Sequence, residues 1–520
     1  MSHLRPLRAT GSAKLSGAVV TVPAGAHRLI ASPLAPGLLE LRLETDAPLP
    51  ASPAALPFAE EAPEPKLEET PGAFRVAMPD LILTIGRDPL TLTIETRANE
   101  VLWGPVACGI ERGKLVLQGP LRSDDAFYGL GEKPGYLDKR GRRYGMWTTD
   151  NIGPHNETDD LLYQAIPFLI TRHRGRACGL LFDDPGRTRY DLGQDDPDAW
   201  RFVADGPGLR FYVAAGPDLH DVIARYTQLT GRMPMPPRWA IGYHQSRWGY
   251  QDAEAIRDIA SQFRARRIPC DVIHLDIDYM DAYRVFTWHP GRHPDPKALM
   301  TELGELGFKA VTIVDPGVKK DPGYGPYDEL STQGLYVRDK EGDPFVGEVW
   351  PGPCLFPDFL REETRQWWGA RHHALTDVGV AGIWNDMNEP SVFRGPAVSR
   401  PDQTMPDDTQ HGDPESPVPH REVHNLYGFY MSQATREGLQ QLQPDKRPFV
   451  ITRSGYAGIQ RHAMVWTGDN HAAWSHLEQS LPMCLNLGLS GVAFCGPDVG
   501  GFSGDTTAEL LIRWTQAGAL

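Results

Sequence analysis

The pattern of hydrophobic positions along this chain changes near residue 235. Before that point, short alternating or β-branched apolar runs lie between Pro and Gly turns, at residues 17–22, 81–85, 90–94, 202–203 and 209–213. Such runs predict an antiparallel β-sandwich, and we assign residues 1–235 to this N-terminal domain. Within it we expect a surface loop over the Pro-, Ala- and Glu-rich residues 47–71 and a helix over residues 219–230. The Pro-rich residues 233–237 mark the boundary.

From residue 236 to 520, short apolar strands alternate with helical patterns, which predicts a parallel α/β domain. The seven strand candidates are residues 239–244, 271–275, 309–314, 380–385, 449–452, 463–466 and 491–495. A polar or charged residue follows nearly every one. Polar and charged residues at the carboxyl ends of successive strands are typical of a (β/α)8 TIM-type barrel, whose active site lies there. A doubly wound open sheet is the alternative, but it would place ligands at a single switch point.

No eighth strand candidate follows the last helical pattern, so we expect a barrel that is truncated before its last strand and has an exposed edge. Residues 391–423 are rich in Pro, Asp and His and are expected to form a loop insertion. His411, His420 and His424 lack the spacing of metal ligands, so we interpret this insertion as a polar surface loop and expect no metal site.

Composition and charge narrow the functional classes. A chain of 520 residues exceeds the usual size of one hydrophobic core, and its net charge of -15 disfavours nucleic acid or an anionic membrane as partner. The sequence contains neither a run of about eighteen apolar residues nor a signal-peptide pattern near its start, so we expect no membrane span and a cytoplasmic protein. The widely spaced cysteines are expected to be buried free thiols: Cys108, Cys178, Cys270, Cys354, Cys484 and Cys495.

Two motifs contain candidate catalytic residues: GIWNDMNEP at residues 382–390 and VWTGDN at residues 465–470. Each places an aspartate, Asp386 or Asp469, at an expected strand end. An aspartate there is often only a helix cap or a turn former. However, the first motif crowds several ionic or amide side chains behind an apolar strand, which is costly unless they bind something. Two carboxylates are also the minimum requirement for cleaving a glycosidic bond.

The chain resembles the α-glucosidase branch of glycoside hydrolase family 31 over about residues 120–520. The resemblance rests on ordered motifs: YGLGE (128–132), GYHQSRWGY (242–250), HLDIDYM (274–280), VWPG (349–352), FPDF (356–359), WNDMNEP (384–390), RSG (453–455), WTGDN (466–470) and GPDVGGF (496–502). The α-xylosidase and sulfoquinovosidase branches tend to have Asp-Phe-Gly-Glu where this chain has DMNE at residues 386–389. Glucose is therefore the expected sugar.

The resemblance implies a retaining, exo-acting α-glucosidase without a cofactor, acting on maltose-type α-glucoside oligosaccharides. It further implies that Asp386 is the nucleophile and Asp469 the general acid/base, whereas the residues alone do not decide between these roles. It also implies that Asp276 and Arg453 bind sugar hydroxyls, with Asp278 as a supporting or capping group. We expect Trp466 to support Asp469 and Asp150 to reach the rim of the site. The other candidate substrate-binding residues are Trp248, Trp350, Trp384, Ile277, Met387, Asp498 and Phe502.

Two other functions stay open from the sequence. Relatives continue beyond the last segment with a strand that bears an Arg-Asn-His type motif, and its absence here favours a carbohydrate-binding protein or an inactive fragment. An α-glucan lyase is the third hypothesis, since it would use the same nucleophile. The products distinguish the three: glucose, none, or an unsaturated sugar derivative.

Overall fold

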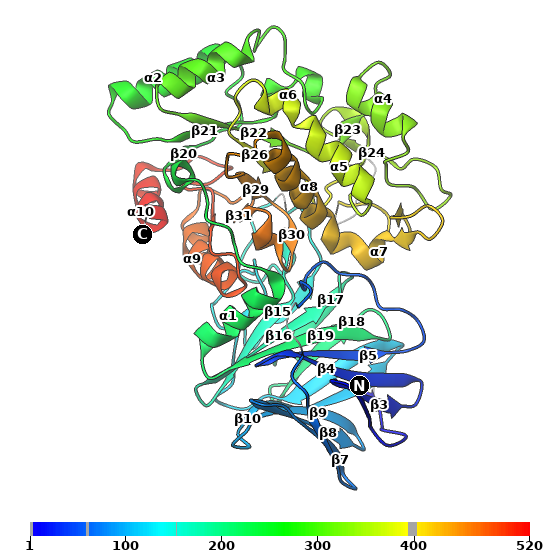
Figure 1. The fold of residues 1–520 in the computed structure, drawn as a ribbon. Helices are drawn as coiled ribbons and strands as arrows, with labels where there is room; N and C mark the ends of the chain where they lie inside the picture. The colour runs from blue at the N-terminus through cyan, green and yellow to red at the C-terminus, as the bar shows by residue number, and fades with distance from the viewer. Residues whose placement is uncertain (1–3, 59–61, 152, 394–402, 520) are drawn as a thin grey trace.

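The computed structural model describes residues 4–58, 62–151, 153–393 and 403–519 (Figure 1). A β-sandwich forms one half of the molecule and a parallel sheet with surrounding helices forms the other. Both parts of the predicted fold class are confirmed. None of the helices in the described ranges is both long and apolar enough to cross a membrane.

The sandwich consists of two antiparallel sheets. In spatial order, the larger contains β13 (Arg143–Met146), β17 (Thr188–Asp191), β18 (Ala199–Ala204), β11 (Lys114–Pro120), β10 (Val101–Glu111), β9 (Leu90–Thr96), β8 (Leu81–Arg87), β7 (Ala73–Ala77) and β6 (Lys66–Glu69), with β1 (Arg5–Pro6) beside β10. The smaller contains β12 (Ala126–Gly129), β15 (Phe168–His173), β16 (Arg176–Asp183), β19 (Leu209–Gly216), β5 (Leu38–Glu44), β4 (His27–Ala35), β3 (Val19–Ala24) and β2 (Lys14–Ser16).

Alternation of apolar and polar residues places the core between these sheets. Leu90, Leu92 and Ile94 of β9 are buried, while the threonines between them are only partly buried. The expectation of a loop throughout residues 47–71 was wrong in part, because β6 forms an edge strand beside β7. Its residues are mostly exposed, so hydropathy gives no signal for it.

The second domain is built on seven parallel strands in sequence order. They are β20 (His244–Gln245), β21 (Val272–Leu275), β22 (Lys309–Val314), β26 (Gly382–Asn385), β29 (Val450–Thr452), β31 (Met464–Trp466) and β32 (Cys495–Gly496). Five of the seven candidates are confirmed over most of their length, whereas residues 239–244 and 491–495 each share a single residue with the observed two-residue strand. Residues 239–241 belong to a 3-10 helix, η1 (Arg238–Ile241). Within the described residues the sheet runs from β20 to β32 without closing.

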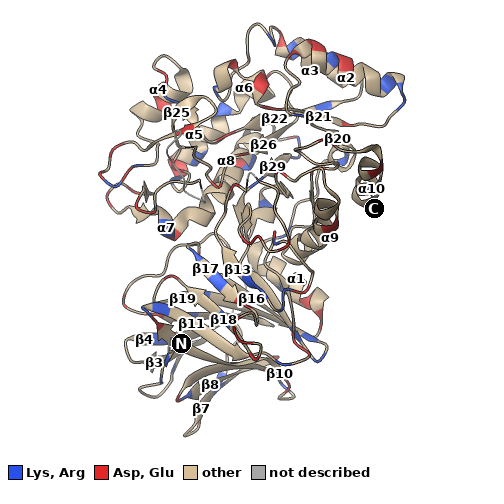
Figure 2. Cartoon of the chain, turned by 180° about the vertical axis from the view of Figure 1, so that it is seen from behind, with Lys and Arg blue, Asp and Glu red and all other residues tan. Residues whose placement is uncertain are grey.

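Helices cover this sheet on its outer side (Figure 1). They are α2 (Ala253–Ala265), α3 (Pro296–Glu305), α4 (Gly325–Thr332), α5 (Glu362–Arg371), α6 (His373–Thr376), α8 (Tyr427–Leu442), α9 (Trp474–Leu489) and α10 (Ala508–Ala519). Strand β21 shows the division of faces: Ile273 and Leu275 join the core that includes α2 and α3, and Val272 belongs to a separate cluster. Both acidic and basic residues lie along α2 and α3 at the outer surface (Figure 2).

Shorter strands and 3-10 helices complete the domain. They are β23 (Val318–Lys319), β24 (Val346–Val349), β25 (Gly352–Leu355), η2 (Ile277–Tyr279), η3 (Asp281–Tyr283), η4 (His424–Leu426) and η5 (Ile459–Arg461).

A helix and a strand pair are among the connections between the domains. Helix α1 (Leu219–Thr230) spans the predicted residues, and the Asp218 side chain caps its start by accepting a hydrogen bond from the Asp221 N–H. Strand β14 (Gln164–Ala165) of the sandwich domain pairs in parallel with β30 (Gly455–Tyr456) of the barrel domain. The strand pair matters for function, because β30 begins two residues after Arg453, one of the candidate substrate-binding residues.

The insertion is only in part the surface loop that we expected, because residues 413–417 are exposed but other described parts are buried. Its described part contains β27 (Gln410–His411), β28 (Val418–Pro419) and α7 (His420–Val423), whereas residues 394–402 lie outside the described residues. His411, His420 and His424 are all buried. A histidine is polar on its own, but mutual hydrogen bonds remove the cost of burying it, and composition does not reveal such pairing.

The cysteines are free thiols, as expected. Cys108, Cys178, Cys270 and Cys354 are buried, while Cys484 and Cys495 are partly buried.

Candidate active site

The candidate site residues follow consecutive strands of the parallel sheet. Asp276 comes directly after β21, Asp315 after β22, Asp386 after β26, and Arg453 after β29. Asp469 follows β31 at a distance of three residues. Because these strands are parallel and adjacent, their carboxyl ends meet at one edge of the sheet and bring the side chains together.

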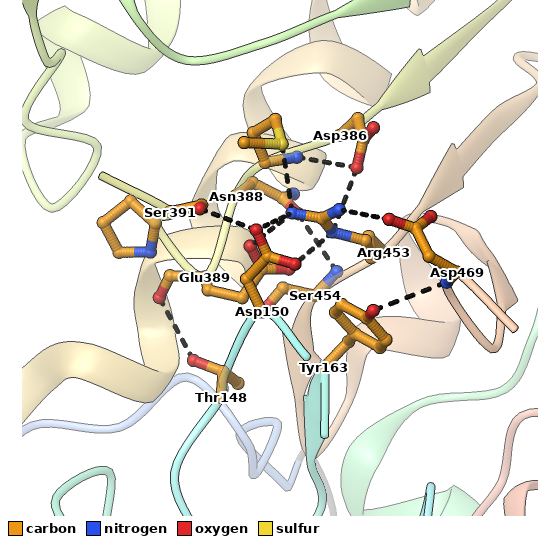
Figure 3. A network of polar contacts seen from close by, with 12 residues as sticks. Thr148, Asp150, Tyr163, Asp386, Asn388, Glu389, Ser391, Arg453, Ser454 and Asp469 are labelled. Carbon is orange, nitrogen blue, oxygen red and sulfur yellow. Dashed lines mark hydrogen bonds and ion pairs between the residues drawn. The ribbon is translucent and has the colours of Figure 1, made fainter. Parts of the chain in front are cut away.

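Arg453 is the centre of the site (Figure 3). Its side chain is buried, and its guanidinium contacts four carboxylates. The N···O distances are 3.0 Å to Asp386, 3.6 Å to Asp469, 2.8 Å to Glu389 and 3.4 Å to Asp150. The two candidate catalytic aspartates are therefore held by one cation.

The loop after β26 fixes the orientation of this cation. Glu389 accepts two hydrogen bonds from Arg453, at its Nε (2.9 Å) and at one Nη (2.8 Å). Asn388 donates to Thr452 Oγ1 (2.9 Å) and accepts from the Ser454 N–H (3.0 Å), so it ties the two loops together on either side of Arg453. Bidentate carboxylate pairing holds a guanidinium in one plane.

The same loop turns sharply at Met387. Its φ of 56° lies in the left-handed region, which is uncommon for a residue with a side chain. The turn brings the Met387 N–H to 2.8 Å from Asp386 Oδ1 and the sulfur to 3.2 Å from an Arg453 nitrogen. Backbone geometry thus fixes one oxygen of Asp386, which leaves the other for a ligand.

The sandwich domain supplies part of the site. Asp150 is buried, pairs with Arg453 and accepts a hydrogen bond from Ser391 Oγ at 2.8 Å. The expectation that it reaches the rim was therefore wrong: ion pairing with a buried guanidinium draws it inward. Tyr163 lies against Arg453, with the guanidinium carbon 4.9 Å from its ring centre, and its OH accepts from the Asp469 N–H at 3.4 Å.

Gly468 permits this contact of Tyr163 with the Asp469 loop. Its φ is +68°, and a Cβ there would overlap the Tyr163 ring. Glycine is therefore required at this position both for its conformation and for the close approach of the ring.

The charge balance of the site raises carboxyl pKa values. Burial raises the pKa of Asp386 to about 7, Arg453 opposes this shift, and Asp469 and Asp150 add to it. Burial raises the pKa of Asp469 to about 6, again opposed by Arg453 and increased by Asp150 and Glu389. Burial also raises the pKa of Glu389 to about 7. One guanidinium cannot neutralise so many carboxylates, so protons are retained near neutral pH.

Asp276 and Asp278 differ in their surroundings. Burial and then the nearby charges of Asp386 and Asp278 raise the pKa of Asp276 to about 7. Asp278 instead pairs with Arg292 at 3.5 Å and accepts from the Tyr283 OH at 3.4 Å. Asp276 also caps η2 by accepting from the Ile277 N–H at 2.7 Å.

Two more carboxylates belong to this electrostatic environment. Burial raises the pKa of Asp498 well above its ordinary value, and the charges of Asp469, Asp386 and Asp276 raise it further. The pKa of Asp315 is raised in the same way, by burial and by the charge of Asp386. The sequence analysis assigned no role to either Asp315 or Glu389. The position of Asp315 at a strand end and the DMNE motif were the available signals.

The candidate aromatic residues form two groups. Trp248 and Trp350 are exposed, and their ring centres lie 5.8 Å apart; Phe393 packs edge-on against Trp350 at 4.9 Å. Trp384 and Trp466 instead pack edge-to-face at 5.3 Å, with Trp466 buried. The exposed pair can present apolar faces to a ligand, and the second pair lies on β26 and β31, the strands that precede the two candidate catalytic aspartates.

The last two candidates differ in exposure. Ile277 is buried, and Phe502 is exposed.

One group of potential metal ligands among the described residues is compact enough to hold an ion. It consists of Asp124, Asp125 and His173, in the sandwich domain.

Carboxylates at the strand ends of a barrel-type sheet, around a buried arginine, define the class of carbohydrate-cleaving enzymes. The family model described as "Glycosyl hydrolases family 31 TIM-barrel domain" matches residues 233–520, more than half of the chain. The model described as "Glycosyl hydrolase 31 N-terminal galactose mutarotase-like domain" matches residues 28–191. The chain belongs to glycoside hydrolase family 31.

Similar proteins support this assignment. "Alpha-glucosidase 2" of Bacillus thermoamyloliquefaciens is 51% identical over 76% of this chain and 49% of its own length. "Neutral alpha-glucosidase AB" of Homo sapiens is 37% identical over 82% of this chain and 47% of its own length. The solved structure of a Flavobacterium johnsoniae family 31 dextranase complexed with isomaltotriose superposes with a TM-score of 0.90 at 28% identity, over 99% of this chain and 64% of that one. The chain thus spans about half the length of these curated relatives.

Proposed function

We propose that this protein is a retaining, exo-acting α-glucosidase that releases terminal non-reducing glucose from maltose-type oligosaccharides. The observation that carries the proposal is the pair Asp386 and Asp469 on one buried guanidinium, at 3.0 and 3.6 Å. Two carboxylates held this way face one sugar ring, and a retaining mechanism needs such a pair in close proximity. The names of the α-glucosidase relatives support glucose as the sugar.

In this mechanism Asp386 attacks the anomeric carbon and forms a glucosyl ester, while Asp469 donates a proton to the departing oxygen. Asp469 then removes a proton from water, and the hydroxide attacks the anomeric carbon and releases glucose with Asp386 free again. The contacts of the two aspartates support this assignment of roles, whereas their pKa values of about 7 and about 6 do not separate the roles. Asp386 has the closer contact with Arg453, which favours its ionised form, and Asp469 is the more solvent-accessible of the two, as exchange of a proton with water requires.

The remaining residues bind and align the sugar. Asp276 and Arg453 lie where they can bind hydroxyl groups of the glucosyl unit. The exposed faces of Trp248 and Trp350 suit the apolar face of a pyranose ring. We assign Asp498 a supporting role, because its backbone exchanges two hydrogen bonds with the side chain of Asn470, the residue after Asp469.

The experiment is to follow maltose hydrolysis by proton NMR in deuterated buffer. A retaining α-glucosidase releases α-glucose first, before mutarotation to the β anomer. A 5-fluoro glucosyl fluoride should in addition label the peptide that contains Asp386, as read by mass spectrometry. Initial release of β-glucose, or a label on another peptide, would overturn the proposed mechanism; an unsaturated sugar would indicate a lyase.

A further inference from the structure

Tyr163 of the sandwich domain lies against the loop that carries Asp469, and no step of the proposed reaction uses it. Its side chain is fully buried. It directly precedes β14, the strand that pairs with β30 of the barrel domain. Figure 3 shows its hydroxyl directed at the backbone N–H of Asp469. Tyr163 is therefore part of the contact between the two domains at this loop.

The partners of the Tyr163 hydroxyl determine the direction of both of its hydrogen bonds. The carbonyl oxygen of Asn151, 2.8 Å away, can only accept, so the Tyr163 proton is donated to it. The Asp469 nitrogen, 3.4 Å away, carries a proton to donate, so the Tyr163 oxygen accepts from it. Burial and then the charge of Asp469 raise the pKa of Tyr163 well above its ordinary value, so the hydroxyl keeps its proton. One hydroxyl therefore ties residue 151 of the sandwich domain to residue 469 of the barrel domain.

Other contacts anchor the residue that follows Asp469. The side chain of Asn470 donates to the Asp498 carbonyl and accepts from the Asp498 N–H, both at 3.0 Å. The Asp469 N–H instead has the Tyr163 oxygen as its hydrogen-bond acceptor. Tyr163 thus acts at the position that carries the carboxylate.

The Asp469 carboxylate is held less firmly than the Asp386 carboxylate. It lies 3.6 Å from Arg453, whereas Asp386 lies 3.0 Å from it and also accepts a hydrogen bond from the Met387 N–H. Strong donors would favour the ionised form, which is unsuitable for a carboxyl group that must gain and lose a proton in each turnover. The orientation of the Asp469 carboxylate therefore depends on the backbone that carries it.

Neighbouring groups hold the Tyr163 ring in place. The guanidinium carbon of Arg453 lies 4.9 Å from the ring centre. Gly468 lies so close to the ring that a Cβ there would overlap it. A ring packed in this way cannot move far, so the hydroxyl stays at the Asp469 backbone.

We propose that Tyr163 is a positioning residue for Asp469: its hydroxyl fixes the Asp469 backbone so that the carboxyl group meets the glycosidic oxygen. This inference rests on the proposed function. In the first step the Asp469 carboxylic acid gives its proton to the departing oxygen as the bond from that oxygen to the anomeric carbon breaks. In the second step the Asp469 carboxylate takes a proton from water. Tyr163 exchanges no proton in either step and acts only through the position of Asp469.

Tyr163→Phe removes the hydroxyl and keeps the ring against Arg453. Because maltose needs a proton on its leaving group, its kcat/KM should fall about tenfold. A dinitrophenyl α-glucoside departs without a proton, so its kcat/KM should stay within about twofold of wild type. Tyr324→Phe is the matched control, since it removes another buried hydroxyl, which donates to the Val285 carbonyl. Equal losses on both substrates would overturn the proposal.

Gly468→Ala tests the same contact from the side of the loop. Its Cβ would meet the Tyr163 ring and move the Asp469 backbone away from the hydroxyl, with Tyr163 itself unchanged. The variant should show the same dependence on the leaving group as Tyr163→Phe. It therefore decides the question even if Tyr163→Phe does not fold.

A double-mutant cycle separates action through Asp469 from action through Arg453 or the fold. The substrate is methylumbelliferyl α-glucoside, whose fluorescent product reports slow turnover. Tyr163→Phe should lower kcat/KM about threefold when Asp469 is present, and should change it by less than about 1.5-fold when residue 469 is already alanine. A loss of the same size in both backgrounds would show that Tyr163 does not act through Asp469.

Hydrogen exchange followed by mass spectrometry tests the contact without turnover. Tyr163→Phe leaves the Asp469 N–H without its acceptor, so the peptide over residues 466–473 should take up about one more deuterium at early times than in the wild type. Tyr324→Phe should match the wild type. Unchanged exchange in Tyr163→Phe would overturn the proposal. If the wild type cleaves none of these substrates, the proposed function fails, and the exchange result still decides whether Tyr163 anchors the Asp469 loop.

Discussion

At the residue scale, Arg453 organises this site. It is one of few cations among several buried carboxylates, and its contacts come from the catalytic loop, the following strand end and the sandwich domain. Burying charged groups is costly unless each has a partner, so removal of any one carboxylate leaves the others to share the same guanidinium. The residues around it are therefore expected to affect both catalysis and stability.

Asp386→Asn should abolish glucose release from an aryl α-glucoside. The amide cannot form the glucosyl ester, and loss of a covalent nucleophile costs about 10⁴-fold or more in kcat. Steady-state kinetics measure the effect, with Asp278→Asn as the control because Asp278 pairs with Arg292 instead. Activity within about tenfold of wild type would remove Asp386 from the mechanism.

Asp469→Ala should have an effect that depends on the leaving group. An acid catalyst matters less when the departing oxygen is already acidic, so maltose cleavage should fall much further than cleavage of a nitrophenyl glucoside. Added azide should restore turnover of the nitrophenyl substrate by taking the place of the activated water. Equal losses on both substrates, without rescue, would argue against the acid/base role.

Asp386→Asn should also change the pH dependence of stability. The folded pKa of Asp386 is about 7 and its ordinary value is 3.8, so the folded state binds a proton that the unfolded chain releases. The stability that this group contributes is thus fully present below about pH 4 and is lost as pH rises to about 7. The neutral amide avoids this loss, and we expect the variant to gain about 1 to 4 kcal/mol relative to wild type at pH 8 and little at pH 4.

Urea unfolding at several pH values measures this difference. Exposed Asp445→Asn is the control and should follow the wild type throughout. A variant that is less stable than wild type at pH 8 would contradict this prediction. It would show that the ion pair of Asp386 with Arg453 stabilises the fold by more than burial of the Asp386 charge destabilises it.

At the element scale, the packing of α5 on α8 depends on two glycines. Gly369 of α5 and Gly438 of α8 are both buried, and each Cα lies in the space that a Cβ of the other would need. Helix α8 lies next to strands β29 and β30 and to η4, so it supports the elements that carry Arg453 and His424. Close approach of these two helices thus fixes the outer layer behind the site.

Gly438→Ala should destabilise the protein, although alanine is the better helix former. Its Cβ would overlap the Gly369 backbone, which cannot rotate away, and overpacking of this kind costs about 1 to 3 kcal/mol. Gly488→Ala in α9 is the matched control, because nothing lies within 4 Å of its Cβ position. That variant should be neutral or more stable by up to about 1 kcal/mol. Thermal unfolding compares the two, and equal changes would contradict the packing argument.

At the scale of the whole molecule, the sandwich and the barrel domain form one site between them. Pairing of β14 with β30 places Gln164 so that its amide donates to the Arg453 carbonyl at 2.6 Å. Five large apolar residues of α9 and α10 are exposed: Trp474, Leu481, Leu485, Leu511 and Ile512. Exposed apolar side chains of this size favour association.

We therefore expect residues 1–520, expressed alone, to self-associate. Light scattering coupled to size-exclusion chromatography should show oligomers or aggregates at micromolar concentration. Replacing Leu481, Leu485 and Ile512 with Lys should shift the chain toward a monomer, because lysine removes apolar surface and adds repulsion. Exposed Glu509→Lys on α10 controls for added charge alone. A monodisperse wild-type monomer would contradict this expectation.

The sequence by itself determined the elements and the family. Hydrophobic alternation indicated the sandwich strands, apolar runs followed by polar residues indicated the seven barrel strands, and ordered motifs indicated family 31. These signals are local: each depends on neighbouring residues and on the periodicity of a strand or helix. Strands with little buried surface, such as β6, and the short outer strands were the least predictable for the same reason.

Only the tertiary structure decided which side chains meet. Glu389 and Asp150 are far apart along the chain, yet both contact Arg453, and one of them was expected at the rim. The histidines of the insertion were expected at the surface, yet they are buried because each satisfies the next. Hydrogen bonds and ion pairs between distant segments determine whether a polar residue can be buried, and no local pattern records them.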